Sequence, residues 1–271
     1  MQHVIITGGG SGLGLGIARR YLARGANVSI LDLAIPDSNR SELDAAALSG
    51  KGRWHFLQMD ITQDELVDQA VVHAVREFGA PDLAINSAGI AVNKTLADMT
   101  AGEFRKVIDI NLNGSLYFAQ SCVKHMRPGS RLALVASLAG ITSNYGYSAY
   151  GASKFGVVGL ATTLRYEYEV LGIHISCICP PEVYTPLVEA ERQVGNPISL
   201  ELKKTAGCMD ANDACDQIVA GLDAGRWMII PSIAGKITGF VARHLPGLFN
   251  GYIQLMVRKL SKQYPVTVHR A

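Results

Sequence analysis

The sequence predicts an α/β fold: a doubly wound, seven-stranded parallel sheet flanked by helices and followed by a C-terminal helical extension. Short β-branched runs alternate with longer segments of helical periodicity, as in parallel strands joined by right-handed crossover helices. The strand runs are almost continuously apolar, as expected of strands covered on both faces. With 271 residues, 48% of them hydrophobic and 18% charged, the chain can bury one large core.

The expected elements follow one another in a regular order. The strands are the apolar runs His3–Thr7, Asn27–Leu31, Arg53–Gln58, Leu83–Asn86, Arg131–Ala136, Ile173–Cys179 and Arg226–Ile230. The helices are Leu13–Arg24, Gln63–Phe78, Gly102–Met126, Ala149–Leu171 and Ala211–Ala224, and a weaker helix follows Asn39. No repeat or linker divides this series, so we expect a single domain.

Composition excludes several classes of function. A net charge of +2 without a basic run argues against nucleic acid as a partner. The five cysteines are odd in number and no pair has the C-x-x-C spacing, so we expect no metal site and a reducing, cytoplasmic location. A strand starts directly after Met1-Gln2, so we expect no signal peptide.

A glycine-rich turn joins the first strand to the first helix. The segment Thr7–Gly14 reads TGGGSGLG and leads straight into helical periodicity. Glycines allow a tight turn and the close approach of a pyrophosphate, and the helix N-terminus supplies free N–H groups. Turns also use glycine for purely structural reasons, so the position between strand and helix carries this interpretation. It predicts a Rossmann-type dinucleotide site.

An acidic residue ends the second strand. Asp32 lies 18 positions beyond Gly14, where a carboxylate can accept hydrogen bonds from the adenosine ribose hydroxyls and repel a 2′-phosphate. No Arg or Lys lies between positions 33 and 39, and the first one afterwards is Arg40. We therefore expect NAD(H) and not NADP(H) as the cofactor. The alternative is that Asp32 only caps a turn.

A tyrosine and a lysine share one helical face in the middle of the chain. Tyr150 and Lys154 are four positions apart at the start of a predicted helix. A phenol has a pKa of about 10, and a nearby ammonium favours its ionised form. Ser137 follows the strand Arg131–Ala136 at the carboxyl edge of the sheet, where its hydroxyl can hold a substrate oxygen. This set predicts proton transfer.

Together these motifs resemble the short-chain dehydrogenase/reductase family over residues 3–230. The matching segments are Thr7–Gly14, Asp60-Ile61, Asn86-Ser87-Ala88-Gly89, Asn111 within Ile110–Gly114, Ser137 with Tyr150-x-x-x-Lys154, and Pro180–Pro186. The chain departs from the family pattern at Ser87, which replaces an asparagine, and at Pro181, which replaces a glycine and stiffens the loop. The double proline resembles the 3-ketodihydrosphingosine reductases, which act on long-chain lipids but prefer NADPH.

The resemblance implies a role for each matching residue. Tyr150 is the general acid or base, Lys154 lowers its pKa and binds the nicotinamide ribose, and Ser137 positions the substrate oxygen. Asn111 holds a water that relays protons, unless its amide simply bonds to backbone. The implied cofactor-binding residues are Gly8, Ser11, Gly12, Leu13, Gly14, Asp32, Asp60, Ile61, Asn86, Ala88, Gly89, Tyr150, Lys154, Pro180, Val183 and Thr185.

The segments beside the catalytic residues predict an apolar substrate. Leu138–Ser153 and Val183–Val188 contain no charged residue, and Glu182 and Lys94 are expected at the rim. We expect substrate contacts from Ser137, Leu138, Tyr145, Tyr150, Val183 and Leu187, with Ile141 and Tyr147 as further wall residues. A steroid, terpenoid or long-chain lipid fits this lining, and the alternative is a small polar ketone or sugar. The stretch Thr185–Gly207 corresponds to the family's mobile lid.

The tail extends beyond the minimal fold. Ser232–His244 and Gly247–Lys262 read as helices separated by Pro246, so residues 1–231 form the NAD-binding catalytic domain and 232–271 its helical extension. The apolar stripe of the second helix is Phe249, Tyr252, Ile253, Met256 and Leu260, and its basic residues are Arg258, Lys259 and Lys262. The stripe packs on the body or on a subunit of a homodimer or homotetramer. The alternatives are a peripheral membrane contact or a cap over a lipophilic substrate.

The sequence therefore predicts an NAD(H)-dependent oxidoreductase that interconverts a secondary alcohol and a ketone. One alternative is a catalytically silent NAD-binding scaffold, which would not need Asn111, Ser137, Tyr150 and Lys154. Another is an epimerase or dehydratase, whose glycine turn is usually spaced differently and whose C-terminal substrate region is larger.

Overall fold

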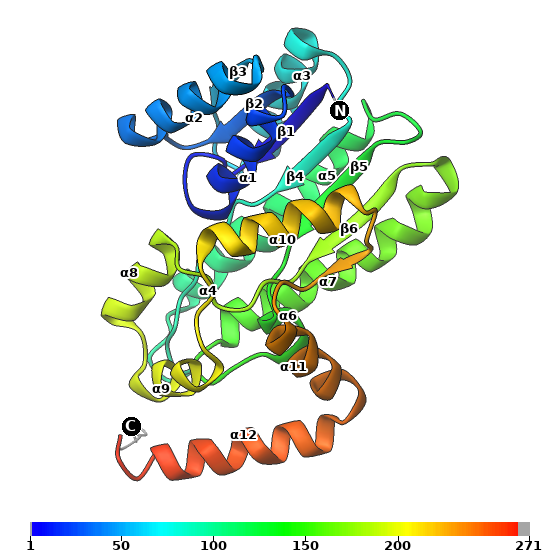
Figure 1. Ribbon diagram of the computed structural model, residues 1–271. Helices are drawn as coiled ribbons and strands as arrows, with labels where there is room; N and C mark the ends of the chain where they lie inside the picture. The colour runs from blue at the N-terminus through cyan, green and yellow to red at the C-terminus, as the bar shows by residue number, and fades with distance from the viewer. Residues whose placement is uncertain (1, 265–271) are drawn as a thin grey trace.

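The computed structural model describes residues 2–264, without the side chains of Thr205 and Ala206. Seven parallel strands form one sheet in the order β3-β2-β1-β4-β5-β6-β7 (Figure 1). They are β1 (His3–Thr7), β2 (Asn27–Asp32), β3 (Trp54–Gln58), β4 (Leu83–Asn86), β5 (Arg131–Val135), β6 (His174–Ile178) and β7 (Met228–Ile229). The predicted fold class is confirmed. The strand order reverses between β1 and β4, which is where ligands bind in such sheets.

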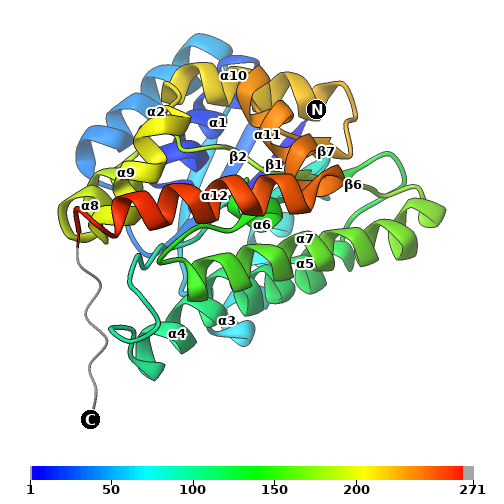
Figure 2. The ribbon, with the colours of Figure 1, turned by 90° about the horizontal axis from the view of Figure 1, so that it is seen from below.

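Helices cover both faces of the sheet, as Figure 2 shows from below. One face carries α1 (Gly12–Ala23), α2 (Asp37–Gly50) and α10 (Ala211–Asp223), and the other carries α3 (Asp64–Phe78), α5 (Gly114–Val123) and α7 (Ser148–Tyr168). Successive strand residues enter the two cores in turn. Ile5 joins the core under α3, α5 and α7, whereas Val4 and Ile6 join the other.

The predicted helix Gly102–Met126 is confirmed over residues 101–123, but a π-helical turn interrupts its α-helical repeat. It consists of α4 (Ala101–Ile108), a π-helical turn Asp109–Asn113, and α5. Asn111 is fully buried in the π-turn and bonds to the backbone of Ile90. A π-turn inserts one residue into the helical repeat and re-aims the side chains after it, which a 3.6-residue periodicity does not reveal.

Two short helices occupy the stretch expected to be the lid. They are α8 (Pro186–Val194) and α9 (Pro197–Ala206), and each begins with a proline directly after its N-cap residue. Proline suits the first helical turn because the N–H that it lacks has no partner there. The Asn196 side chain also accepts a hydrogen bond from the Ile198 amide. We call residues Thr185–Gly207 the lid.

The tail forms two helices, as predicted. They are α11 (Ile233–His244) and α12 (Pro246–Leu260), so Pro246 begins the second helix rather than lying between the two. The first packs against the short α6 (Ala139–Thr142) and the second against α9. In Figure 1 both lie below the sheet, outside its helical layers. Residues 265–271 of the predicted extension lie outside the described residues.

Candidate active site

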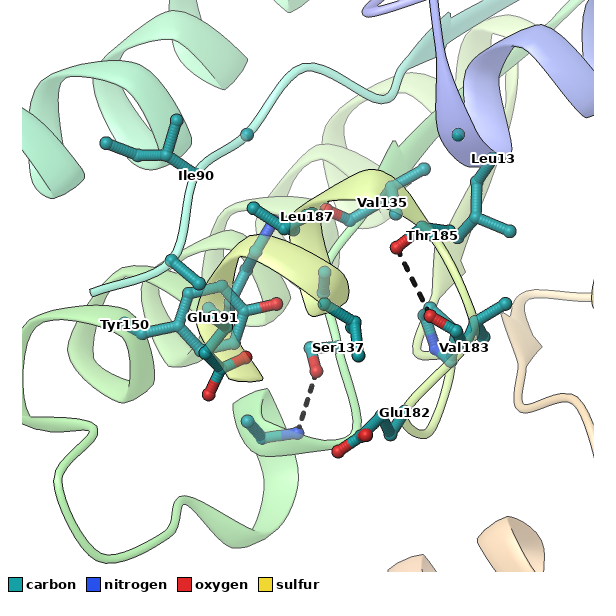
Figure 3. Close-up of a pocket in the computed structure, with 18 of the residues that line it drawn as sticks. Leu13, Ile90, Val135, Ser137, Tyr150, Glu182, Val183, Thr185, Leu187 and Glu191 are labelled. Atoms are coloured by element: carbon teal, nitrogen blue, oxygen red, sulfur yellow. Dashed lines mark hydrogen bonds between the residues drawn. The ribbon is translucent and has the colours of Figure 1, made fainter. Parts of the chain in front are cut away.

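One cavity of about 640 Å³ runs along the carboxyl edge of the sheet. The glycine turn and the ends of β2 and β3 line one half of it. The segments after β4, β5 and β6, the lid and α12 line the other half. Figure 3 shows Ser137 and Tyr150 at this cavity together with Val183 and Thr185 of the loop after β6 and Leu187 of α8.

The glycine turn exposes backbone to the cavity. Gly8 has a φ of +63°, and a Cβ there would lie 2.6 Å from the amide nitrogen of Ala88. A Cβ at Gly14 would lie 2.1 Å from the carbonyl oxygen of Gly8. These approaches leave no room for side chains. Gly8, Ser11, Gly12 and Leu13 line the cavity, whereas Gly14 lies outside the lining and lets the helix pack on the turn.

The Asp32 carboxylate is held at the edge of this cavity. One oxygen accepts a hydrogen bond from the Gly10 amide at 2.8 Å and the other from the Leu33 amide at 2.7 Å. The first basic residue after Asp32 along the chain is Arg40. Its guanidinium stacks over the Phe56 ring, 5.2 Å from the ring centre, instead of pairing with Asp32. This end of the cavity therefore presents a fixed negative charge.

The other predicted cofactor residues divide into two groups. Those that line the cavity are Asp60, Ile61, Ala88, Gly89, Tyr150, Lys154, Pro180, Val183 and Thr185. Asn86 lies outside the lining. It is buried, accepts a hydrogen bond from the Thr7 hydroxyl and donates one to the Ser115 hydroxyl at 2.6 Å, so it ties β1 and β4 to α5.

The residues predicted to take part in proton transfer, Ser137, Tyr150 and Lys154, meet where β5 ends and α7 begins. Burial raises the pKa of Tyr150 to about 12, and a hydrogen bond with Ser137 opposes that rise. Burial also lowers the pKa of Lys154 to about 8. The Lys154 ammonium donates to the Val135 carbonyl at 2.9 Å and lies 5.7 Å from the centre of the Tyr150 ring. Its expected effect on the pKa of Tyr150 stays a prediction.

Asn111 lies behind this group and outside the cavity lining. Its amide donates to the Ile90 carbonyl at 2.9 Å and to the Ser153 hydroxyl at 3.0 Å, and its oxygen accepts from the Ile90 amide at 2.9 Å. The alternative role for Asn111, in which its amide bonds to the backbone, is therefore present in the structure. A Cβ on Gly89 would lie 3.2 Å from the Asn111 oxygen and 3.5 Å from the Lys154 nitrogen, so both groups border the same small space. The water relay stays a prediction.

The sequence profile of the short chain dehydrogenase family matches residues 2–195. The chain belongs to the short-chain dehydrogenase family. It is 32% identical over 233 residues to a 3-dehydrosphinganine reductase of Arabidopsis thaliana, a match covering 84% of this chain and 69% of that one. It is 30% identical over 192 residues to a D-beta-hydroxybutyrate dehydrogenase of Rhizobium meliloti (strain 1021), covering 70% and 74%. The crystal structure of levodione reductase superimposes with a TM-score of 0.77 at 30% identity, covering 87% and 97%.

Membership confirms the resemblance carried by the motifs. It makes the chain an oxidoreductase acting on alcohol or ketone groups with a nicotinamide cofactor. Of the predicted substrate residues, Ser137, Leu138, Tyr150, Val183 and Leu187 line the cavity of this short-chain dehydrogenase, whereas Tyr145 lies outside the lining. Ile141 also lies outside it and Tyr147 lies within it. Lys94, expected at the rim, pairs with Glu103 away from the cavity.

A buried ion-pair network links the lid to the start of α7, and sequence reasoning missed it. Glu191 of α8 accepts hydrogen bonds from the Tyr147 hydroxyl and the Asn93 amide, both at 2.6 Å. The Lys203 ammonium of α9 donates to Glu191 at 2.8 Å and lies 3.0 Å from a carboxylate oxygen of Glu182. Only 4% of the Glu191 side chain, 7% of Glu182 and 12% of Lys203 are exposed.

This network lines the cavity beside Ser137 and Tyr150. Burial, with the Glu191 carboxylate next to it, raises the pKa of Tyr147, so this phenol stays protonated and donates. The Tyr147 ring lies 5.0 Å from the Tyr150 ring, centre to centre. The lid is therefore held close to Tyr150. The prolines and N-cap residues at 185–186 and 196–197 are the sequence signal that could have predicted α8 and α9.

Proposed function

We propose that this short-chain dehydrogenase uses NAD(H) to interconvert a secondary alcohol and a ketone in a lipophilic substrate. The observation that carries the proposal is the convergence of Ser137, Tyr150 and Lys154 on a cavity that also contains the glycine turn and Asp32. A silent scaffold needs no such convergence.

The chain's residues fit a dinucleotide. Gly10 has no space for a side chain, since a Cβ there would lie 2.4 Å from the Ala34 carbonyl oxygen, and Gly12 has a φ of +53°. A turn stripped of side chains at a helix N-terminus favours a pyrophosphate. Asp32, without an opposing cation, favours free ribose hydroxyls over a 2′-phosphate and hence NAD(H). The bound nicotinamide supplies or accepts the hydride.

The protein's own contribution is position and proton transfer. During reduction, the Ser137 hydroxyl holds the carbonyl oxygen, and the Tyr150 phenol donates a proton to it as the carbon becomes a secondary alcohol. A pKa of about 12 keeps that phenol protonated at neutral pH, which suits an acid. During oxidation the Tyr150 phenolate takes the proton back. The Lys154 ammonium stabilises this phenolate and exchanges protons through the space beside Asn111 and Gly89.

The cavity lining supports a lipophilic substrate. Its walls at the catalytic end include Leu138, Val183, Leu187, Phe249 and Ile253. The lid does bring a cation into the lining, because Lys203 lies there. That cation is neutralised by Glu182 and Glu191 and is not free to bind a substrate carboxylate. Burying apolar ligand surface contributes about 25 cal/mol per Å², so a sterol-sized molecule needs no ion pair.

A small polar substrate is the second candidate, because the names of the relatives include substrates of both kinds. One relative is named for a sphingoid ketone and another for a hydroxy acid. The free cysteines, among the residues that the structure describes, are consistent with a reducing compartment such as the cytoplasm. A homodimer or homotetramer remains our expectation for the assembly.

The test is a ketone series of increasing apolar size, with NADH oxidation followed by absorbance. We expect kcat/KM to rise with apolar size, and Tyr150→Phe, as the matched control, to be inactive throughout. Faster turnover of small polar ketones or sugars would show that the substrate class is wrong while leaving the reaction class intact.

A further inference from the structure

The chain's charge is distributed unevenly. From Ala224 to the C-terminus there are seven Lys and Arg residues and no Asp or Glu, although the whole chain has a net charge of only +2. Residues 1–223 hold the other 18 Lys and Arg and all 23 Asp and Glu, a net charge of −5. The C-terminal part of the chain thus has a net charge of +7, whereas the rest of the chain is net negative. Among residues 2–264, none of the cationic side chains of α11 and α12 forms an ion pair.

The same two helices expose large apolar side chains. On α11, Ile233, Ile237 and Phe240 recur every three or four residues and are at least 58% exposed. The next helix continues with Leu248, Tyr252 and Leu255, spaced in the same way and at least 55% exposed. Such spacing places each set on one face of its helix. These six residues are called the tail surface below.

Basic residues lie three or four positions along each helix from the apolar residues of the tail surface. Lys236 and Arg243 occupy the adjoining positions of α11, and Arg258 and Lys259 follow Leu255 by three and four positions on α12. All four are exposed. The partly buried residues Phe249, Ile253, Met256 and Leu260 belong to the other side of α12, which packs against α9. The helix thus has one face for the body of the protein and another with no partner within the described residues.

We propose that α11 and α12 dock this protein onto an anionic lipid bilayer through the tail surface. Apolar side chains on one face, with basic residues beside them and no acidic ones, are the composition of a helix that lies in the interfacial plane. Within residues 2–264 no helix is long and apolar enough to cross a membrane, so the contact is peripheral.

Charge decides between a bilayer and a second copy of this chain. A two-fold symmetric dimer through the tail surface would bring the same patch of each subunit together, and so would bring the four basic residues of one subunit close to those of the other. An anionic bilayer attracts all four. Each basic residue near such a surface strengthens binding about fivefold.

Docking in this way also orients the active site. Phe249, Tyr252 and Ile253 line the cavity, and Figure 2 shows α12 running across that side of the molecule. A bilayer under the tail surface would therefore lie beside the cavity. Membrane binding goes beyond the proposed reaction and is measured without turnover, so either proposal can fail alone.

The experiment is co-sedimentation of the full chain with vesicles of phosphatidylcholine alone or mixed with phosphatidylglycerol. We expect binding to the mixed vesicles, weakened by salt, and little binding to phosphatidylcholine alone. Arg258→Gln with Lys259→Gln should weaken binding roughly 25-fold, at fivefold for each residue. Ile237→Gln with Phe240→Gln should also weaken it, because apolar insertion is lost.

Matched controls lie on other helices. Arg105→Gln with Lys106→Gln removes two adjacent exposed basic residues from α4, and Leu48→Gln removes an 84% exposed leucine from α2. Both should bind vesicles like the unmodified chain. The proposal is overturned if the chain does not sediment with anionic vesicles, if both vesicle types bind it equally, or if the controls weaken binding as much as the tail variants. It is also overturned if light scattering shows a dimer that the tail variants dissociate, without vesicle binding.

Discussion

Replacing Lys203 with methionine tests whether the buried network holds the lid against the catalytic helix. The change removes the cation 2.8 Å from Glu191 and 3.0 Å from Glu182, whose side chains are 4% and 7% exposed. Breaking one partner of a buried ion pair costs about 3–5 kcal/mol, here because the Glu191 carboxylate stays desolvated without a cation. Glu182 keeps its ion pair with Arg192. The lid relieves this cost by opening, since α8 and α9 carry Glu191 and Lys203 themselves. At 1.4 kcal/mol per tenfold, about 3 kcal/mol shifts lid closure roughly a hundredfold.

The assay is steady-state kinetics with limited proteolysis of the lid. We expect kcat/KM to fall roughly a hundredfold, mainly through KM, and cleavage within residues 185–207 to become faster. The matched control is Lys204→Met on the same helix, where the lysine is 70% exposed and pairs with Glu201 at the surface. It should change little, because surface pairs contribute little to stability. Equal effects of the two substitutions would refute the claim that the buried network holds the lid closed.

Three further predictions concern the reaction itself. Tyr150→Phe should retain dinucleotide binding in a fluorescence titration but lose about 10²–10⁴-fold in turnover, and near-normal activity would contradict the mechanism. Asp32→Ala with Leu33→Arg should shift kcat/KM from NADH towards NADPH, and a preference for NADPH in the unmodified chain would mean that this site is misread. Burial raises the pKa of Tyr150 to about 12 and lowers that of Lys154 to about 8. Alcohol oxidation, which needs the phenolate, should therefore speed up as pH rises towards 8, where Lys154 is still an ammonium. Ketone reduction uses the protonated phenol and should stay nearly level over the same range. Parallel pH profiles for the two directions would contradict these roles.

Patterns in short stretches of sequence were enough to predict the sheet and the candidate proton-transfer residues. The strands are buried on both faces, so their apolar runs stand out, and the predicted bounds of β1 and β4 match the structure. Tyr150 and Lys154 share a helical face because they are four residues apart, and Ser137 follows a strand whose end is fixed by the sheet. Each of these placements depends on only one or two neighbouring elements.

The features that sequence reasoning missed depend on contacts between residues far apart in the sequence, or on a local irregularity in a helix. Glu191 and Lys203 are charged residues on short helices, and charged side chains are usually exposed to solvent. They are buried here because they pair with each other and with Tyr147, which lies some 50 residues earlier. The π-turn places the Asn111 amide against the Ile90 backbone, which lies 21 residues earlier. No periodicity along the chain encodes either arrangement.

The central claim is a direct transfer of hydride between NAD(H) and a carbonyl carbon, coupled to proton transfer by Tyr150. The most direct measurement is mass spectrometry of the alcohol formed from an apolar ketone with NADH deuterated at its hydride-donating carbon. We expect one deuterium on the carbinol carbon of the product from the unmodified enzyme, and almost no product with Tyr150→Phe. Alcohol without deuterium from both stereospecifically labelled forms of NADH, or equal labelled product from the two enzymes, would contradict the account.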